Sequence, residues 1–257
     1  MRKPHALIAA LVTAVGFSVG GAAHPAAQNA RLIVSVATSM FEALQEIAGL
    51  YKQDRGVTVN LNTGGSNTLG RQIVEGARVA VFISADEAQM DVVENAGRLV
   101  PSTRVRLLTN ELAVVVPLEP PSSLTAQQLL AGRVNRLAMG EPSAVPAGVY
   151  GRRWLEHEGA WAAVQSKVVP FPTVRAVLAA VEAGRVDGGI VYRTDVKAST
   201  AVRVLLQISS KEHAYLNIVQ PAAVVAGPFE AEGRRFLAYL QGTKARAAFT
   251  RHGFGLP

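Results

Sequence analysis

The chain has 257 residues, a formal net charge of +7 and no cysteine. Without cysteine, the sequence excludes disulfides, thiolate catalysis and a lipid-modified N-terminal cysteine. Lys and Arg are scattered rather than grouped, and only 6% of the residues are aromatic, so no nucleic-acid partner is expected.

The first residues have the layout of a secretory signal peptide. Arg2 and Lys3 form a basic start, residues 6–19 form an apolar run, and residues 20–23 are small. The run is shorter than the ~20 apolar residues that a membrane-spanning helix needs. We therefore expect a signal peptide and processing region over residues 1–30, and a freely diffusing protein in a bacterial periplasm.

Strand-like and helix-like segments alternate in the first half of the remaining chain. Apolar, β-branched runs predict strands and helical spacing of apolar residues predicts helices, giving strands at 32–37, 57–61 and 79–83 and helices at 40–52, 69–77 and 86–96. This alternation favours an α/β fold with a parallel sheet covered by helices.

The second half follows a less regular order. The predicted strands are 112–117, 136–139, 189–192, 203–208 and 215–226, and the predicted helices are 124–131, 148–158, 174–183, 230–240 and 243–252. We interpret the whole as two α/β lobes, with the chain crossing out near residue 113 and returning near residue 222. The first lobe would take residues 31–112 plus 222–257, and the second lobe residues 113–221.

Several strand-to-helix turns carry small residues and uncharged hydrogen-bond donors. These turns contain Ser39, residues 64–68, residues 143–148, residues 172–175 and Tyr192. Ligands of open α/β sheets lie beyond the carboxyl ends of strands, where the next helices begin. Helix N-termini carry unpaired N–H groups and partial positive charge, so several of them together would bind an anion without Lys or Arg. Taken singly, the turns are ordinary helix starts, and Ser39 with Glu42 fits a capping box.

Catalysis has little support in the sequence. The chain contains no G-x-S-x-G, S-x-x-K or H-E-x-x-H motif, and no cluster with metal-ligand spacing. An exported serine hydrolase using Ser66 is the alternative from a different class, and it would need the fold to bring His157, His213 or His252 close. We therefore expect a binding protein rather than an enzyme.

Six segments resemble one known family. In chain order they read "VATSMFEALQEIAGLYKQ", "TGGSNTLGRQIVEGA", "VFISADEAQMD", "MGEPSAVPAGVYGRRWLE", "TVRAVLAAVEAGRVDGGIVYRTD" and "FLAYLQGTKARAAFTRHGF". Together they resemble the periplasmic molybdate-binding proteins of ABC-type molybdate importers over nearly the whole chain after the leader. The resemblance implies the two-lobed periplasmic-binding-protein fold of type II. Each lobe would be a mostly parallel sheet flanked by helices, and the ligand would lie in the cleft between the lobes.

The resemblance also implies a ligand set. The hydroxyl groups of Ser39, Ser66 and Tyr192 and the backbone N–H groups of Ala147 and Val174 would hold molybdate. Molybdenum would be present only as this oxyanion, and no cofactor is implied. The implied partners are molybdate or tungstate and the membrane permease of an ABC importer, with the binding protein itself a monomer.

Three positions depart from the family pattern. Residues 78–80 read Arg-Val-Ala where Pro-Ala-Asp is usual, and Gly64-Gly65 replaces a more serine-rich loop. Arg193 follows Tyr192 where the family has a small residue. Its side chain would either add positive potential at the mouth of the cleft or lie in solvent.

A site made only of donors suits molybdate. At neutral pH this anion is fully deprotonated, so its oxygens only accept hydrogen bonds. Protonated phosphate would face a donor with its own proton and is disfavoured. Sulfate and thiosulfate share the charge pattern of molybdate. A binding protein for another tetrahedral oxyanion is therefore the main alternative, and the size of the cavity distinguishes it from a molybdate-binding protein.

Overall fold

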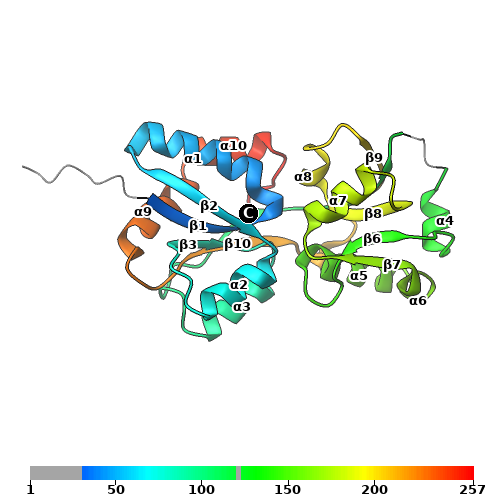
Figure 1. Cartoon of the computed structure of the whole chain (residues 1–257), viewed down its shortest axis with the longest axis horizontal. Helices are drawn as coiled ribbons and strands as arrows, with labels where there is room; N and C mark the ends of the chain where they lie inside the picture. The colour runs from blue at the N-terminus through cyan, green and yellow to red at the C-terminus, as the bar shows by residue number, and fades with distance from the viewer. Residues whose placement is uncertain (1–30, 120–122) are drawn as a thin grey trace, which may run out of the picture.

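The computed structural model describes residues 31–119 and 123–257, so the predicted leader over residues 1–30 lies outside the described residues. Two five-stranded sheets lie end to end along the long axis of the molecule, each with helices packed around it (Figure 1). The predicted two-lobed α/β fold is confirmed. No helix in the described ranges has both the length and the apolar character needed to cross a membrane.

The first lobe is built around the sheet with strand order β2-β1-β3-β10-β4. Its strands are β1 (Arg31–Ala37), β2 (Thr58–Gly64), β3 (Val81–Ile83), β4 (Val105–Thr109) and β10 (Val219–Val224). Its helices are α1 (Phe41–Arg55), α2 (Ser66–Val74), α3 (Glu87–Asn95), α9 (Glu230–Leu240) and α10 (Thr243–Arg251). A short 3-10 helix, η1 (Thr38–Met40), joins β1 to α1.

The second lobe is built around the sheet with strand order β7-β6-β8-β5-β9. Its strands are β5 (Leu112–Pro117), β6 (Leu137–Gly140), β7 (Val168–Phe171), β8 (Gly188–Tyr192) and β9 (Val202–Ile208). Its helices are α4 (Ala126–Leu130), α5 (Pro146–His157), α6 (Trp161–Val164), α7 (Val174–Glu182) and α8 (Arg193–Val196), with 3-10 helices η2 (Gln165–Lys167) and η3 (Ala214–Leu216).

The two sheets repeat one topology. In each sheet the first three strands are parallel, the fourth is antiparallel to both of its neighbours, and the fifth runs with the first three. The reversed strands are β5 and β10, which are the first strands after each passage of the chain between lobes. The predicted lobe boundaries, 112/113 and 221/222, fall at the start of β5 and within β10.

Some elements differ from the sequence predictions. Strands β4 and β7 and helices α6 and α8 were not predicted, and the strand predicted over residues 215–226 is shorter. Residues 214–216 form a 3-10 turn instead, and β10 begins at Val219. Pro221 lies inside β10 at a shift of register with β4, because proline lacks the N–H group that a regular ladder needs.

Buried apolar strands hold the site in place. All six residues of β5 and all five of β8 are buried, and β8 lies between β5 and β6 in the sheet. The carboxyl ends of β1, β2, β6, β7 and β8 are followed by η1, α2, α5, α7 and α8. These strand ends meet between the lobes, at the position where open α/β sheets bind ligands.

Candidate functional site

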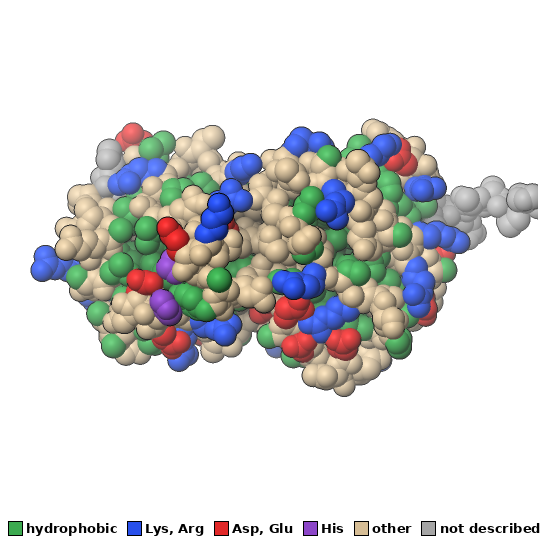
Figure 2. Space-filling model, turned by 180° about the vertical axis from the view of Figure 1, so that it is seen from behind, with side chains coloured by type: hydrophobic (Ala, Val, Ile, Leu, Met, Phe, Trp, Pro, Cys, Tyr) green, Lys and Arg blue, Asp and Glu red, His purple; other side chains and the backbone are tan. Residues whose placement is uncertain are grey.

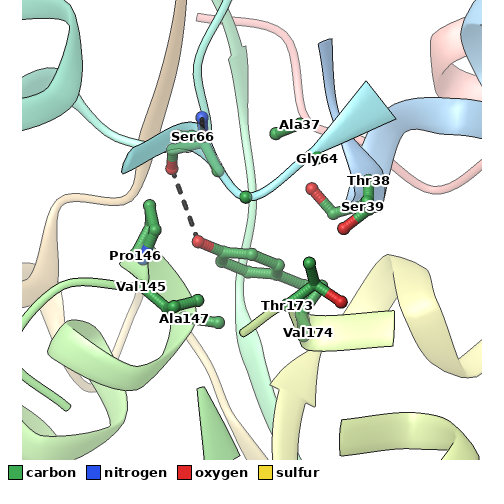
Figure 3. Close-up of a pocket in the computed structure, with 13 residues that line it drawn as sticks. Ala37, Thr38, Ser39, Gly64, Ser66, Val145, Pro146, Ala147, Thr173 and Val174 are labelled. Carbon is green, nitrogen blue, oxygen red and sulfur yellow. Dashed lines mark hydrogen bonds between the residues drawn. The ribbon is translucent and has the colours of Figure 1, made fainter. Parts of the chain in front are cut away.

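A small cavity lies between the two lobes. The space in it that is open to water is about 10 Å³, and its lining includes all five predicted ligand residues, Ser39, Ser66, Ala147, Val174 and Tyr192. Figure 3 shows Ser39 and Ser66 approaching it from the first lobe and Ala147 and Val174 from the second. Each of the five residues is at most 4% exposed.

Ser39 is a buried hydroxyl without a partner. It lies in η1, and no side chain caps the start of α1, so the predicted capping box is wrong. Glu42, the other member of that pattern, instead pairs with Arg175 of the second lobe. The Ser39 Oγ atom is buried and makes no hydrogen bond within the described residues. A buried hydroxyl of this kind is costly unless a ligand completes it.

Ser66 is the first residue of α2, and its hydroxyl is oriented by a neighbouring strand end. Its Oγ atom accepts a hydrogen bond from the backbone N–H of Ala85 at 2.9 Å. Because one lone pair is used in this way, the O–H proton remains available to donate. Ala85, which follows β3, was not predicted as part of the site. It also lines the cavity, within the "FISAD" segment.

Two helix starts supply backbone donors from the second lobe. Ala147 is the second residue of α5, after Pro146 at the first position, and Val174 is the first residue of α7. N–H groups at these positions have no acceptor within the helix. The Thr173 side chain caps α7 by accepting from Ala176 N–H at 3.2 Å, which leaves the Val174 N–H group uncapped.

Tyr192 ends β8 and contributes a phenolic donor. Its hydroxyl group donates a hydrogen bond to the carbonyl oxygen of Ala85 at 3.4 Å, across the boundary between lobes. Burial is the main reason that the pKa of the Tyr192 phenol is held well above its ordinary value. The hydroxyl group therefore keeps its proton and can act as a donor at neutral pH.

Among the described residues, no charged side chain lines the cavity. Arg193 neither points into the mouth nor lies free in solvent. It forms an ion pair with Glu111 at 3.0 Å and donates to the carbonyl oxygen of Gly253 at 2.9 Å. Arg175 directly follows the Val174 donor in α7. Its guanidinium pairs with Glu42 and with Asp195, whose carboxyl lies 3.2 Å away.

The geometry does not support a hydrolytic serine. Within the described residues, no histidine lines the cavity that contains Ser66. The Ser66 Oγ atom instead accepts a hydrogen bond from a backbone N–H group. His157 and His213 lie near each other and near Tyr215, while His252 pairs with Glu46 at 2.9 Å. No described histidine is therefore placed to take a proton from Ser66.

The lobes are closed on each other around the cavity. A Cβ atom added to Gly65 of the first lobe would lie 2.8 Å from the carbonyl oxygen of Pro172 in the second. Arg175 of the second lobe also donates to the carbonyl oxygen of Thr38 at 3.4 Å, and Lys197 to that of Arg251 at 3.3 Å. Sequence reasoning missed these contacts, because they depend on how two distant segments meet.

The comparisons with known proteins agree with this architecture. A family model described as a bacterial extracellular solute-binding protein matches residues 32–255. The chain is 36% identical to the molybdate-binding protein ModA of Escherichia coli over 246 residues, covering 94% of each chain. It is 31% identical to the ModA protein of Haemophilus influenzae, covering 96% of this chain and 95% of the relative.

A solved structure gives the same result. The periplasmic molybdate-binding protein of Azotobacter vinelandii superposes with a TM-score of 0.77 at 27% identity, covering 88% of this chain and 99% of that one. The resemblance noted in the sequence is thus confirmed, and it is a likeness to binding proteins rather than to enzymes. The chain belongs to the family of bacterial extracellular solute-binding proteins.

Proposed function

We propose that this protein captures molybdate outside the cytoplasm and delivers it to the permease of an ABC importer. The observation that carries the proposal is an interlobe cavity that the described part of the chain lines with hydrogen-bond donors and with no charged side chain. Relatives with 36% and 31% identity over almost their whole length are named molybdate-binding proteins, which supports the same ligand.

Five groups would form the ligand shell. The hydroxyl groups of Ser39, Ser66 and Tyr192 and the N–H groups of Ala147 and Val174 each donate to an oxygen of the anion. The unpartnered Ser39 Oγ atom and the free proton of Ser66 support this assignment, because both need an acceptor that the described protein does not supply. No protein atom would bind molybdenum directly.

A donor-only shell also determines selectivity. Neutral donors compensate a dianion without burying a cation that would lose its partner whenever the cleft opened. Phosphate retains a proton near neutral pH and would meet no acceptor, so it would bind weakly. Tungstate has nearly the shape and charge of molybdate, so we expect it to bind as well. Sulfate has the same charge but is smaller, and would make poorer contacts.

The proposal requires the lobes to open. The five proposed ligand residues are each at most 4% exposed, so an anion in solution reaches them only when the lobes part. Neither lobe alone carries the full donor set, so ligand binding favours the closed form. The permease would then distinguish loaded from empty protein by this shape. The proposed moving units are residues 31–112 plus 222–257 and residues 113–221.

The proposed setting follows from the family and from the leader. Residues 1–30 would direct export and be removed, and the remaining chain would act as a monomer in the periplasm. One of the relatives is named as a putative ABC transporter substrate-binding lipoprotein of Bacillus subtilis, at 33% identity over 99% of each chain. That name supports an ABC importer as the partner of this chain.

Titration calorimetry with molybdate, tungstate, sulfate and phosphate tests the proposal. We expect tight one-to-one binding of the first two anions and weak or no binding of phosphate. At a thousandfold excess over Kd, ligand binding should raise the free energy of unfolding by ~4 kcal/mol. Tyr192→Phe should weaken binding about tenfold or more, because hydrogen bonds to charged groups are worth ~1.5–3 kcal/mol. Equal affinity for phosphate and molybdate would contradict the donor-only argument.

A further inference from the structure

A second cluster of polar side chains lies in the second lobe, away from the interlobe cavity. It consists of His157, Glu158 and His213, each of which offers one ligand atom, and these atoms all lie within 4.8 Å of one another. His157 is the last residue of helix α5 and Glu158 follows it, whereas His213 comes from the segment between β9 and η3 that leads back to the first lobe. Figure 2 shows histidine and acidic side chains gathered on this face of the lobe.

The distances in the cluster are close to those of a metal site. Zinc binds nitrogen and oxygen ligands at ~2.0–2.2 Å, so tetrahedral ligand atoms lie roughly 3.3–3.5 Å apart. The Nδ1 atom of His157 lies 3.3 Å from Oε1 of Glu158, and Nδ1 of His213 lies 4.0 Å from the same oxygen. The three ligand atoms, all within 4.8 Å of one another, are therefore close to the required separation.

Neighbouring rings hold the histidines in place. The His157 ring stacks on Tyr215, with centroids 4.2 Å apart and planes 17° apart, and His213 meets Tyr215 edge-on at 5.9 Å. The Nδ1 atom of His213 is buried and makes no hydrogen bond within the described residues. A buried ring nitrogen without a partner is costly, and a metal ion would complete it.

The local charge also favours a cation. Glu158 forms no ion pair with Lys or Arg among the described residues, so its carboxylate is not already neutralised. The cluster surrounds the C-terminal end of α5, where the last carbonyl groups carry partial negative charge. The N-terminal end of the same helix carries Ala147 in the interlobe cavity. One helix would thus present its positive end to an anion and its negative end to a cation.

We propose that His157, Glu158 and His213 form a binding site for a divalent transition metal such as Zn²⁺. Two imidazole nitrogens and one carboxylate oxygen are ligands that zinc prefers. Water fills the fourth position, because the His157 and Glu158 side chains are 58% and 29% exposed. Cu²⁺ and Ni²⁺ would also bind, since nitrogen-rich sites generally follow the common affinity order of these metals. The site is independent of the proposed molybdate shell.

Metal titration tests this site. The protein, purified without a histidine tag and treated with a chelator, is titrated with Zn²⁺ by calorimetry and with Co²⁺ by visible absorption. We expect one metal ion per chain and the strong Co²⁺ bands of tetrahedral coordination. His213→Ala and Glu158→Gln should each weaken Zn²⁺ binding by about a hundredfold or more, beyond the ~10–100-fold loss typical of residues that only support ligands.

His252→Ala is the matched control. His252 also contacts a carboxylate, Glu46, but that carboxylate is shared with Arg251, and no second described histidine joins them in a group that could hold a metal ion. This variant should bind Zn²⁺ as the unmodified protein does. Circular dichroism and melting without metal show whether each variant is folded. No Zn²⁺ binding at about 0.1 mM by the unmodified protein, or an equal loss in His252→Ala, would overturn the proposal.

Discussion

Replacing Gly65 by alanine should weaken oxyanion binding by obstructing closure of the lobes. Gly65 has φ −67° and ψ 140°, which alanine adopts without strain, so the backbone itself tolerates the change. The added Cβ atom would lie 2.8 Å from the Pro172 carbonyl oxygen, a backbone atom of the opposite lobe, and 2.7 Å from the Asn67 Oδ1 atom. The Asn67 side chain can rotate away, whereas the Pro172 carbonyl can move only with its lobe.

The magnitude follows from the cost of overpacking. Forcing an extra carbon into a tight contact costs ~1–3 kcal/mol. Because the clash exists only when the lobes meet, this cost falls on the closed form and reduces affinity by roughly five- to a hundredfold. The open protein loses only the preference for glycine over alanine at a helix N-cap, ~1 kcal/mol of folding stability.

Calorimetry with molybdate and thermal melting without ligand separate the two effects. Gly49→Ala is the control, because a Cβ atom at Gly49 in α1 meets nothing within 4 Å. It should leave affinity unchanged and stabilise the helix by ~0.5–1 kcal/mol. If Gly65→Ala bound molybdate as tightly as the unmodified protein, the interlobe contact would not belong to the ligand-bound form, and the reasoning would fail.

Three further predictions concern single side chains. Ser39→Ala and Ser66→Ala should each weaken molybdate binding about ten- to a hundredfold in titration calorimetry. Ser143→Ala is the control: it removes an exposed hydroxyl hydrogen-bonded to a nearby carboxylate and should leave molybdate affinity unchanged. Glu42→Gln removes a half-exposed ion pair between lobes, so the same assay should show at most about a fivefold loss, and a much larger one would mean that Glu42 acts on the ligand shell. Burial raises the pKa of Asp86 to about 6, so the folded protein holds a proton that the unfolded chain has lost near pH 4. The free energy of unfolding should therefore fall as the pH rises from about 4 to about 6, by up to about 3 kcal/mol, and urea denaturation of Asp86→Asn should show a flatter profile.

The sequence predicted the helix starts well because their signals are local. Small residues before Ser66, Pro146 at the start of α5 and the end of the "GGIVY" segment mark turns whatever the tertiary fold. The structure brings these turns to one cavity, as the position of strand ends in an α/β sheet led us to expect.

Features that depend on contacts between distant segments were not predictable in this way. The Ser39-x-x-Glu42 spacing matched a capping box, but Arg175, more than a hundred residues later, pairs with Glu42 instead. Strands β4 and β7 lack strong alternation of apolar and polar residues, and only pairing with their neighbours defines them. The reversed direction of β5 and β10 is likewise a property of the sheet and not of their composition.

The reversed strands have a mechanical consequence for the proposed ligand shell. Leu112, the first residue of β5, pairs directly with Tyr192, and Ala222 of β10 pairs with Ile83, two residues before Ala85. Tyr192, one of the five proposed ligand groups, and Ala85, which orients Ser66, therefore lie beside the strands through which the chain enters each lobe. Both would be close to an axis of rotation that passes through these connections. A rotation that shifts these groups by a fraction of an ångström would carry the far ends of the lobes through a much longer arc. A ligand only a few atoms wide would thereby control the spacing of surfaces at opposite ends of an elongated molecule.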